Sequence, residues 1–122
     1  MAGRIPLYAD ADIRGQVIEG LIRRGWDLVR AVDIFPQKTK DLVHFEEAAR
    51  RRRVLVAYDV HQLRIALQWL RQGRPFTGFL TWPQLRQKGW SDGTIVAAFE
   101  DLAREDDPFP TGYPIRYLKP RL

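Results

Sequence analysis

The sequence has no cysteine, and this absence removes several kinds of chemistry at once. Disulfide bonds, catalytic thiolates and cysteine-ligated zinc or iron–sulfur sites are all excluded. The sequence also lacks any apolar run near the roughly 18 residues that a transmembrane helix needs. Its first residues, MAGRIPLYAD, turn acidic before a signal-like apolar stretch develops. These absences predict a cytoplasmic protein that does not associate with membranes.

The composition is that of one globular domain with an excess of positive charge. A single hydrophobic core comfortably serves 122 residues, so we expect one domain over residues 1–122. The formal net charge is +5, and arginine far outnumbers lysine. Clustered positive charge attracts polyanions such as RNA. An arginine-rich composition is also typical of some thermophilic or GC-rich genomes, so composition alone leaves both interpretations open.

Strand-like and helix-like segments alternate along most of the chain. We expect strands at residues 5–9, 27–32, 53–58 and 76–82, and helices at residues 13–24, 39–50, 61–72 and 91–103. This alternation predicts an α/β fold with a central, mainly parallel sheet and helices on both faces. Residues 106–122 are rich in proline and should form an irregular tail, with a short edge strand at IRYL.

Two details of this prediction concern the segments around the third strand. The run RVLVAY is largely apolar, which is typical of a central strand that is buried on both faces. The helix before it should begin near Thr39 or Asp41, where either side chain can cap free backbone N–H groups. We expect this helix to bury Leu42, Phe45 and Ala49.

Two of the expected strands are followed by aspartate: Asp10 follows the first and Asp59 follows the third. Ligands of open parallel sheets bind beyond the carboxyl ends of the strands, so both side chains should lie at that edge. If the strands are neighbours, a cation such as Mg²⁺ would relieve the repulsion between the two carboxylates. Asp12 is a further candidate ligand, or the cap of the next helix. Aspartate after a strand is also a common helix cap, so that role stays open for Asp10 and Asp59.

The order of motifs over residues 5–63 resembles the PIN-like domain family, in particular the small toxin-type ribonucleases of toxin–antitoxin systems. The matching segments are YADADI, LIRRGWDLV and KDLVHFEEAARRRRVLVAYDVH. The resemblance implies a three-layer α/β/α fold in which Asp10, Asp41 and Asp59 are the catalytic acids. It also implies that these acids hold Mg²⁺ or Mn²⁺, and that a metal-bound water attacks an RNA phosphodiester. The partners that it implies are RNA, a small cognate antitoxin and a second copy in a homodimer.

This sequence has fewer acidic residues at the matching positions than is usual in that family. Ala57 stands where Thr or Ser is usual, His61 where a second aspartate is usual, and Ala11 where small members often have glutamate. A second hypothesis is therefore a PIN-like fold that has lost activity and serves as a binding module. A third is a phospho-acceptor receiver-like domain, which would use the aspartate after the third strand together with Thr81 and Lys119. Such domains require a last helix, for which the chain has no room after that lysine.

Four further side chains are candidates for contact with RNA or for proton transfer. Arg14 lies one turn from the first-strand aspartate and is placed to bind a phosphate. Trp82 and Trp90 flank the loop PQLRQKG beyond the fourth strand, where they could stack on bases or meet a protein partner. His61 could donate a proton to the leaving oxygen, although a solvent-facing residue in a first helical turn is the plainer interpretation. The arginines at 50–53 approach the opposite edge of the sheet and should not touch a scissile phosphate.

Overall fold

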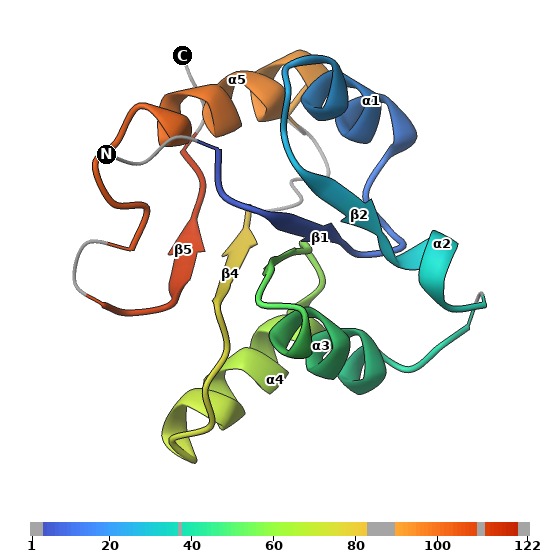
Figure 1. Cartoon of the computed structure of the whole chain (residues 1–122), viewed down its shortest axis with the longest axis vertical. Helices are drawn as coiled ribbons and strands as arrows, with labels where there is room; N and C mark the ends of the chain where they lie inside the picture. The colour runs from blue at the N-terminus through green and yellow to red at the C-terminus, as the bar shows by residue number, and fades with distance from the viewer. Residues whose placement is uncertain (1–3, 37, 83–89, 110–111, 120–122) are drawn as a thin grey trace.

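The computed structural model describes residues 4–36, 38–82, 90–109 and 112–119 of the chain. The strands are β1 (Leu7–Ala9), β2 (Leu28–Arg30), β3 (Val54–Val56), β4 (Gly78–Thr81) and β5 (Ile115–Tyr117). The helices are α1 (Gly15–Arg23), α2 (Ala31–Ile34), α3 (Asp41–Arg50), α4 (Val60–Arg71) and α5 (Asp92–Ala103). Strands and helices alternate along the chain, as the sequence predicts, except that the short helix α2 directly precedes α3 (Figure 1).

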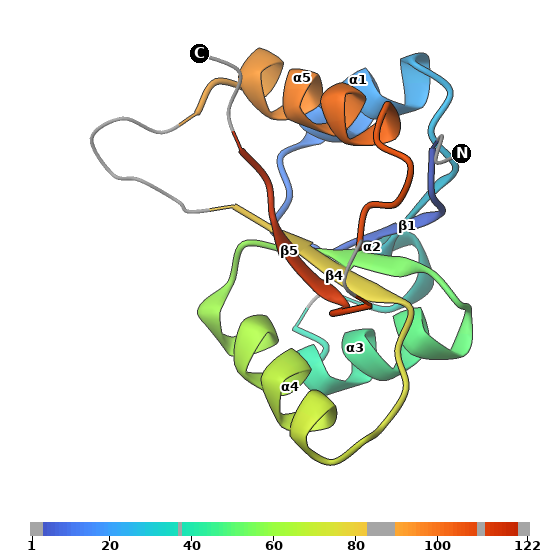
Figure 2. The ribbon, with the colours of Figure 1, turned by 90° about the vertical axis from the view of Figure 1, so that its left-hand side faces the viewer.

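The strands form one sheet in the order β2-β1-β3-β4-β5, and every neighbouring pair is parallel. Helices α1 and α5 cover one face of this sheet, and α3 and α4 cover the other (Figure 2). The prediction of a three-layer α/β/α fold is therefore confirmed. Because α1 follows β1 on one face and α4 follows β3 on the other, the chain diverges beyond these two neighbouring strands. Such a divergence is where open parallel sheets bind ligands.

Strand β3 lies in the middle of the sheet and is buried on both faces, as its apolar sequence predicts. Val54 and Val56 pack in the core cluster beneath α1 and α5, whereas Leu55 packs in the cluster beneath α3 and α4. Successive strand residues point to opposite faces, so this short run serves both cores. Removing each such side chain from water stabilises the fold by roughly 1.5–3 kcal/mol.

The second strand is shorter than the sequence predicts. It ends at Arg30 rather than at Val32, because its partner β1 ends at Ala9 and has no further residues with which to pair. The chain turns instead into the short helix α2, which leaves Val32 38% exposed. Strand propensity in this run is therefore overridden by the length of the neighbouring strand.

Helix α3 begins at Asp41, within the predicted range, but the predicted side-chain cap is absent. Lys40 is the N-cap residue and makes no side-chain cap, while the Thr39 hydroxyl donates to the Pro36 carbonyl at 2.6 Å. The buried face of α3 consists of His44, Phe45 and Ala48. Because successive helical residues are rotated by about 100°, Leu42 falls outside that face and is 45% exposed.

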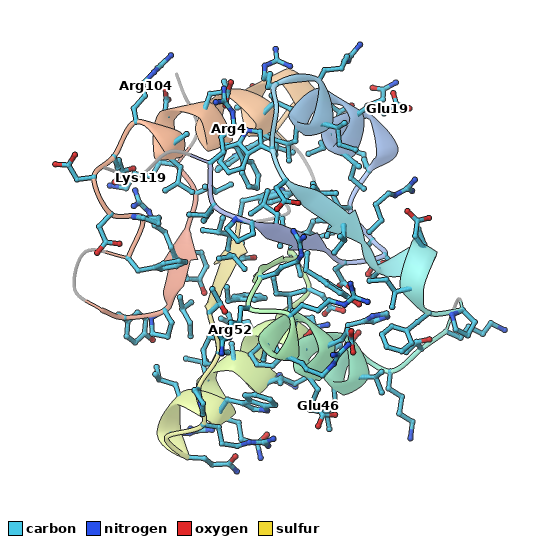
Figure 3. All side chains as sticks on the ribbon, in the orientation of Figure 1. Arg4, Glu19, Glu46, Arg52, Arg104 and Lys119 are labelled. Carbon is cyan, nitrogen blue, oxygen red and sulfur yellow. The ribbon has the colours of Figure 1, made fainter. Side chains whose placement is uncertain are left out.

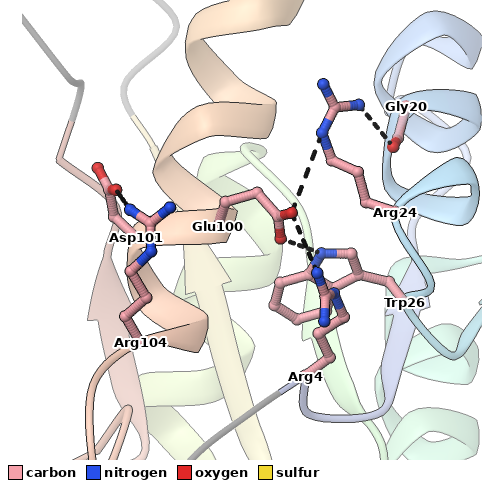
Figure 4. Close-up of polar contacts among 7 residues, drawn as sticks. All are labelled: Arg4, Gly20, Arg24, Trp26, Glu100, Asp101 and Arg104. Carbon is pink, nitrogen blue, oxygen red and sulfur yellow. Dashed lines mark hydrogen bonds and ion pairs between the residues drawn. The ribbon is translucent and has the colours of Figure 1, made fainter.

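Charged contacts join the segments that enter the strands at the amino edge of the sheet. On α5, the Glu100 carboxylate accepts the Trp26 Nε1–H at 3.0 Å and an Arg4 N–H at 3.2 Å (Figure 4). Arg53, which precedes β3, donates to Asp27 Oδ1 at 3.0 Å. The end of the arginine run therefore lies at this edge, away from the carboxyl ends of the strands, as predicted.

The last strand and the outer surface complete the fold. Strand β5 pairs with β4 where the edge strand was predicted, and Arg116 of β5 donates to Glu105 at 2.6 and 2.8 Å. Charged side chains such as Glu19 of α1 and Glu46 of α3 point outward from the layers (Figure 3). In the part of the chain that the structure describes, no helix has the length and apolar character needed to cross a membrane.

Candidate functional site

Asp10 and Asp59 follow neighbouring strands and reach the same edge of the sheet. The pairing of β1 with β3 continues into Asp10, whose N–H donates to the Val56 carbonyl at 3.0 Å. The loops after the two strands are also joined directly, because the Tyr58 hydroxyl donates to the backbone carbonyl of Asp12. The convergence of these two loops, which the sequence predicts, is therefore present in the fold.

The Asp10 carboxyl group is buried among other acids. Asp10 is only 4% exposed, and its pKa is raised to about 6. Burial is the largest cause because it disfavours the charged form, and the backbone N–H of Ala11 opposes the shift. The carboxylates of Asp12, Asp41 and Asp59 raise the pKa of Asp10 further. The four acids that the sequence singled out therefore form one electrostatic group.

Asp41, at the start of α3, belongs to the same group. Burial raises its pKa, and the negative charges of Asp59 and Asp12 add to the effect. The imidazoles of His61 and His44 oppose the shift. Asp41 entered as a candidate only through the family resemblance, and the fold brings it within electrostatic reach of both strand-end aspartates.

Asp59 combines its charge with a structural role. It is the N-cap residue of α4, and its Oδ1 accepts the His61 backbone N–H at 2.8 Å. The cap that the sequence leaves open as an alternative is therefore present at this residue. The cap engages one carboxylate oxygen, and the charge of Asp59 still raises the pKa of Asp10 and of Asp41.

The cap interpretation does not extend to the two acids after β1. Helix α1 begins at Gly15, and its N-cap residue Arg14 makes no side-chain cap bond. Asp12 is exposed, whereas Asp10 is buried. Helix capping therefore explains why an aspartate stands at position 59. It does not explain why Asp10 is buried.

A cleft of about 150 Å³ opens beside these acids. Asp10, Asp12 and Asp41 line it, together with His44. His44 is 4% exposed, and its Nδ1 lies 3.1 Å from the Tyr8 hydroxyl. Sequence reasoning gave His44 no role. Residues three apart in the sequence, such as Asp41 and His44, lie on one side of a helix. That spacing was the one signal that pointed to it.

A buried amide joins the first turns of α3 and α4. Gln62 is fully buried, and its Nε2 donates to the Asp41 backbone carbonyl at 3.1 Å. Its Oε1 has no hydrogen-bond partner among the described residues. The bond holds the helix that begins with Asp41 against the helix that Asp59 caps. Sequence reasoning missed Gln62, because a single polar residue beside an apolar stripe is the usual pattern of a solvent-facing position.

The carboxylates at this edge suit a hard cation that keeps water ligands. Within the described ranges, no three His, Cys, Asp or Glu side chains form a group that could hold a metal ion. Magnesium commonly uses one or two carboxylates and several waters, so a pair of these acids is sufficient. Burial is the largest cause of the raised pKa values of Asp10 and Asp41, and a cation would relieve the smaller contribution from the neighbouring carboxylates. The described residues therefore form no complete metal site, and binding of Mg²⁺ or Mn²⁺ by a pair of these acids with water stays a prediction.

The tryptophans expected to stack on bases face inward. Trp82 is 5% exposed, and its ring packs against those of Tyr58 and Phe99. The residue directly after β4 points toward α5, so its ring completes the core instead of the ligand edge. Trp90 is half-buried against the same core cluster. The stacking role does not fit Trp82. Residues 83–89, between the two tryptophans, lie outside the described residues.

Arg14 and His61 lie at the edge with defined partners. The Arg14 Nε lies 2.7 Å from Asp92 Oδ1, and a guanidinium N–H donates to the Trp90 carbonyl at 3.1 Å. A phosphate would compete with Asp92 for this guanidinium, whose side chain is 55% exposed. His61 is exposed in the first turn of α4, where its backbone N–H is taken by the cap. Both side chains are exposed, and neither lines the cleft.

Comparison with known proteins supplies no relative for this site. No family model, curated protein or solved structure matches the chain. The function is therefore inferred from the acids at the cleft and from the groups that hold them.

Proposed function

We propose that the chain is a metal-dependent ribonuclease with a PIN-like fold, which hydrolyses RNA phosphodiesters at the carboxyl edge of its sheet. The observation that carries the proposal is the electrostatic group of Asp10, Asp12, Asp41 and Asp59, in which a buried acid has its pKa raised to about 6. These acids come from three segments of the chain: the loop after β1, the first residue of α3 and the residue before α4. Acids with perturbed pKa values in a cleft are common at catalytic sites.

Asp10 is the central metal ligand in this proposal. Asp41, Asp59 and Asp12 lie within electrostatic reach of it, and one of them, together with water, would complete the coordination. Bound Mg²⁺ or Mn²⁺ would neutralise charge on the phosphate and lower the pKa of the attacking water. Without a cation, Asp10 holds a proton up to about pH 6, and ligation requires that it give up this proton. The net charge of +5 favours the approach of RNA.

Cleavage of a labelled single-stranded RNA tests this proposal directly. We expect cleavage that requires Mg²⁺ or Mn²⁺, and a loss of about 100-fold in rate for Asp10→Asn, as for other removals of a preorganised electrostatic group. Asp106→Asn, which removes an exposed carboxylate from the tail, is the matched control and should cleave like the wild type. Cleavage that persists in Asp10→Asn would contradict the proposal.

A second candidate is a binding module that has lost catalysis. Two observations favour it: the Asp59 carboxylate already caps α4, and the described residues offer no group of three metal ligands. Such a protein would bind RNA in the anisotropy measurement described below and would cleave none with either metal. The phospho-acceptor hypothesis is less favoured, because Asp59 lies beyond the end of β3 and its Oδ1 is bound to His61 N–H.

Apolar side chains beside the acids support a protein partner at this edge. Val32, Leu42 and Val60 are 38%, 45% and 54% exposed, and the last two directly follow Asp41 and Asp59. A small antitoxin that covers the cleft is the partner we propose, and a second copy of the chain is the alternative. Sedimentation separates them: a dimer that Val60→Lys dissociates would assign the surface to a second copy.

A further inference from the structure

His44 and Tyr8 form a buried polar pair behind the cleft. Tyr8 is fully buried in β1, and its hydroxyl lies 3.1 Å from Nδ1 of His44 in α3. The Phe35 ring packs edge-on against the imidazole, with ring centroids 5.5 Å apart. The imidazole is thus held on two sides, and it lines the cleft that Asp10 and Asp41 also line.

The bond to Tyr8 determines which ring nitrogen of His44 carries a proton. A tyrosine hydroxyl, whose ordinary pKa is about 10, keeps its proton at neutral pH. Among the described residues, His44 Nδ1 is the only hydrogen-bond partner of this hydroxyl. Donation from the hydroxyl to Nδ1 is the favoured direction, because the reverse would leave a buried O–H group unpaired. Burial lowers the pKa of His44, which favours the neutral ring, and the charge of Asp41 opposes this shift. A neutral imidazole whose Nδ1 accepts carries its proton on Nε2.

The Nε2–H group of His44 is therefore a hydrogen-bond donor in the wall of an acidic cleft. Within the described part of the chain Nε2 has no hydrogen-bond partner, so neither Asp10 nor Asp41 accepts from it. A protonated ring nitrogen has no lone pair for a metal ion, and its partner must be an acceptor such as an anionic oxygen. A phosphate group that a cation holds beside these carboxylates presents oxygens of that kind.

We propose that His44 is a substrate-binding residue, which donates its Nε2–H to a non-bridging phosphate oxygen of bound RNA, and that Tyr8 is the positioning residue that fixes this donor. The inference rests on the proposed function and adds a contact to the substrate beyond the metal ligands. A hydrogen bond to a charged oxygen typically changes affinity by about 10-fold or more.

The first measurement is the affinity for RNA by fluorescence anisotropy of a labelled single strand, with Ca²⁺ in place of Mg²⁺ to prevent cleavage. His44→Leu should weaken binding about 10-fold or more, and His44→Gln, whose amide N–H has a similar reach, should stay within about threefold of wild type. Tyr8→Phe should lose part of the affinity, because the ring is no longer held in one tautomer. Tyr117→Phe removes an exposed hydroxyl from β5 and should bind like wild type.

The second measurement is the tautomer of His44 by ¹⁵N NMR of its ring, which depends on neither RNA nor metal. The wild-type protein should show a proton on Nε2, and Tyr8→Phe should show a mixture. A proton on Nδ1 in the wild type would overturn the inference, as would wild-type affinity in a folded His44→Leu. If His44→Leu does not fold, equal affinities of Tyr8→Phe and wild type overturn it. Absence of RNA binding by the wild type is a separate result, which contradicts the proposed function as well.

Discussion

Burial of Asp10 places a carboxyl group where its charged form is unfavourable. Its pKa rises from 3.8 to about 6, so the folded protein holds this proton more tightly than the unfolded chain does. The contribution of Asp10 to stability is therefore most favourable at pH values below 3.8, falls as the pH rises between 3.8 and about 6, and stays low above that. A shift of roughly two units corresponds to about 3 kcal/mol at neutral pH.

Replacement of Asp10 by asparagine should consequently stabilise the protein in a pH-dependent way. We expect Asp10→Asn to raise the free energy of unfolding by up to about 3 kcal/mol at about pH 8, and to change it little at about pH 4. Urea denaturation at the two pH values measures this difference. Asp106→Asn removes an exposed carboxylate and serves as the control. An equal effect of Asp10→Asn at both pH values would show that the buried charge is not the cause.

At the scale of the helices, the site depends on how α3 and α4 meet. Each contributes an acid from its first turn, Asp41 in α3 and the cap residue Asp59 before α4. Gln62 joins these turns through its bond to the Asp41 carbonyl. The relative position of the two carboxylates is therefore set by a contact between helices and not by the sheet alone.

Gln62→Leu should separate the stability of the fold from the geometry of the site. Loss of one hydrogen bond is offset by removal of an unpaired buried oxygen, so we expect the free energy of unfolding to change by less than about 1 kcal/mol. The rise in melting temperature on addition of Mn²⁺ should shrink, because the Asp41 turn is no longer fixed. Gln68→Leu makes the same change on the exposed face of α4 as a control. Undiminished stabilisation by Mn²⁺ in Gln62→Leu would refute the positioning role.

At the scale of the whole molecule, the charged side chains at the two edges of the sheet have opposite effects on stability. The carboxyl edge collects acids that repel one another, which lowers stability. The amino edge carries opposite charges in contact, and Glu100 there joins α5 to Arg4 before β1 and to Trp26 before β2 (Figure 4). Segments distant in the sequence are thus fastened together on the side away from the cleft.

Glu100→Gln tests this division between the edges. A neutral acceptor should weaken the bonds to Trp26 and Arg4 and lower the free energy of unfolding by about 1–2 kcal/mol. Cleavage of RNA at a temperature where the variant is folded should not change, since the cleft is not involved. Glu19→Gln, on the exposed face of α1, should leave stability nearly unchanged. If Glu100→Gln cleaved RNA more slowly but unfolded with the same free energy as the wild type, the two edges would not have separate roles.

The sequence by itself determined the layered fold and the edge to which its acids belong. Hydrophobic periodicity and the alternation of strands with helices specify a parallel sheet, and a strand that ends in aspartate must present it at the carboxyl edge. Asp10 and Asp59 were found in this way. Errors arose at element ends, as at Val32 and Leu42, where the length of a neighbouring strand or the phase of a helix decided the outcome.

Only the tertiary structure decided what each side chain does once it reaches that edge. In the folded protein the Trp82 ring packs in the core, and Asp59 caps helix α4. Tyr8 of β1 and His44 of α3 form a hydrogen bond. These outcomes depend on the direction of single bonds and on contacts between residues far apart in the chain. Local patterns in a sequence report the period of an element, and they carry no information about such pairs.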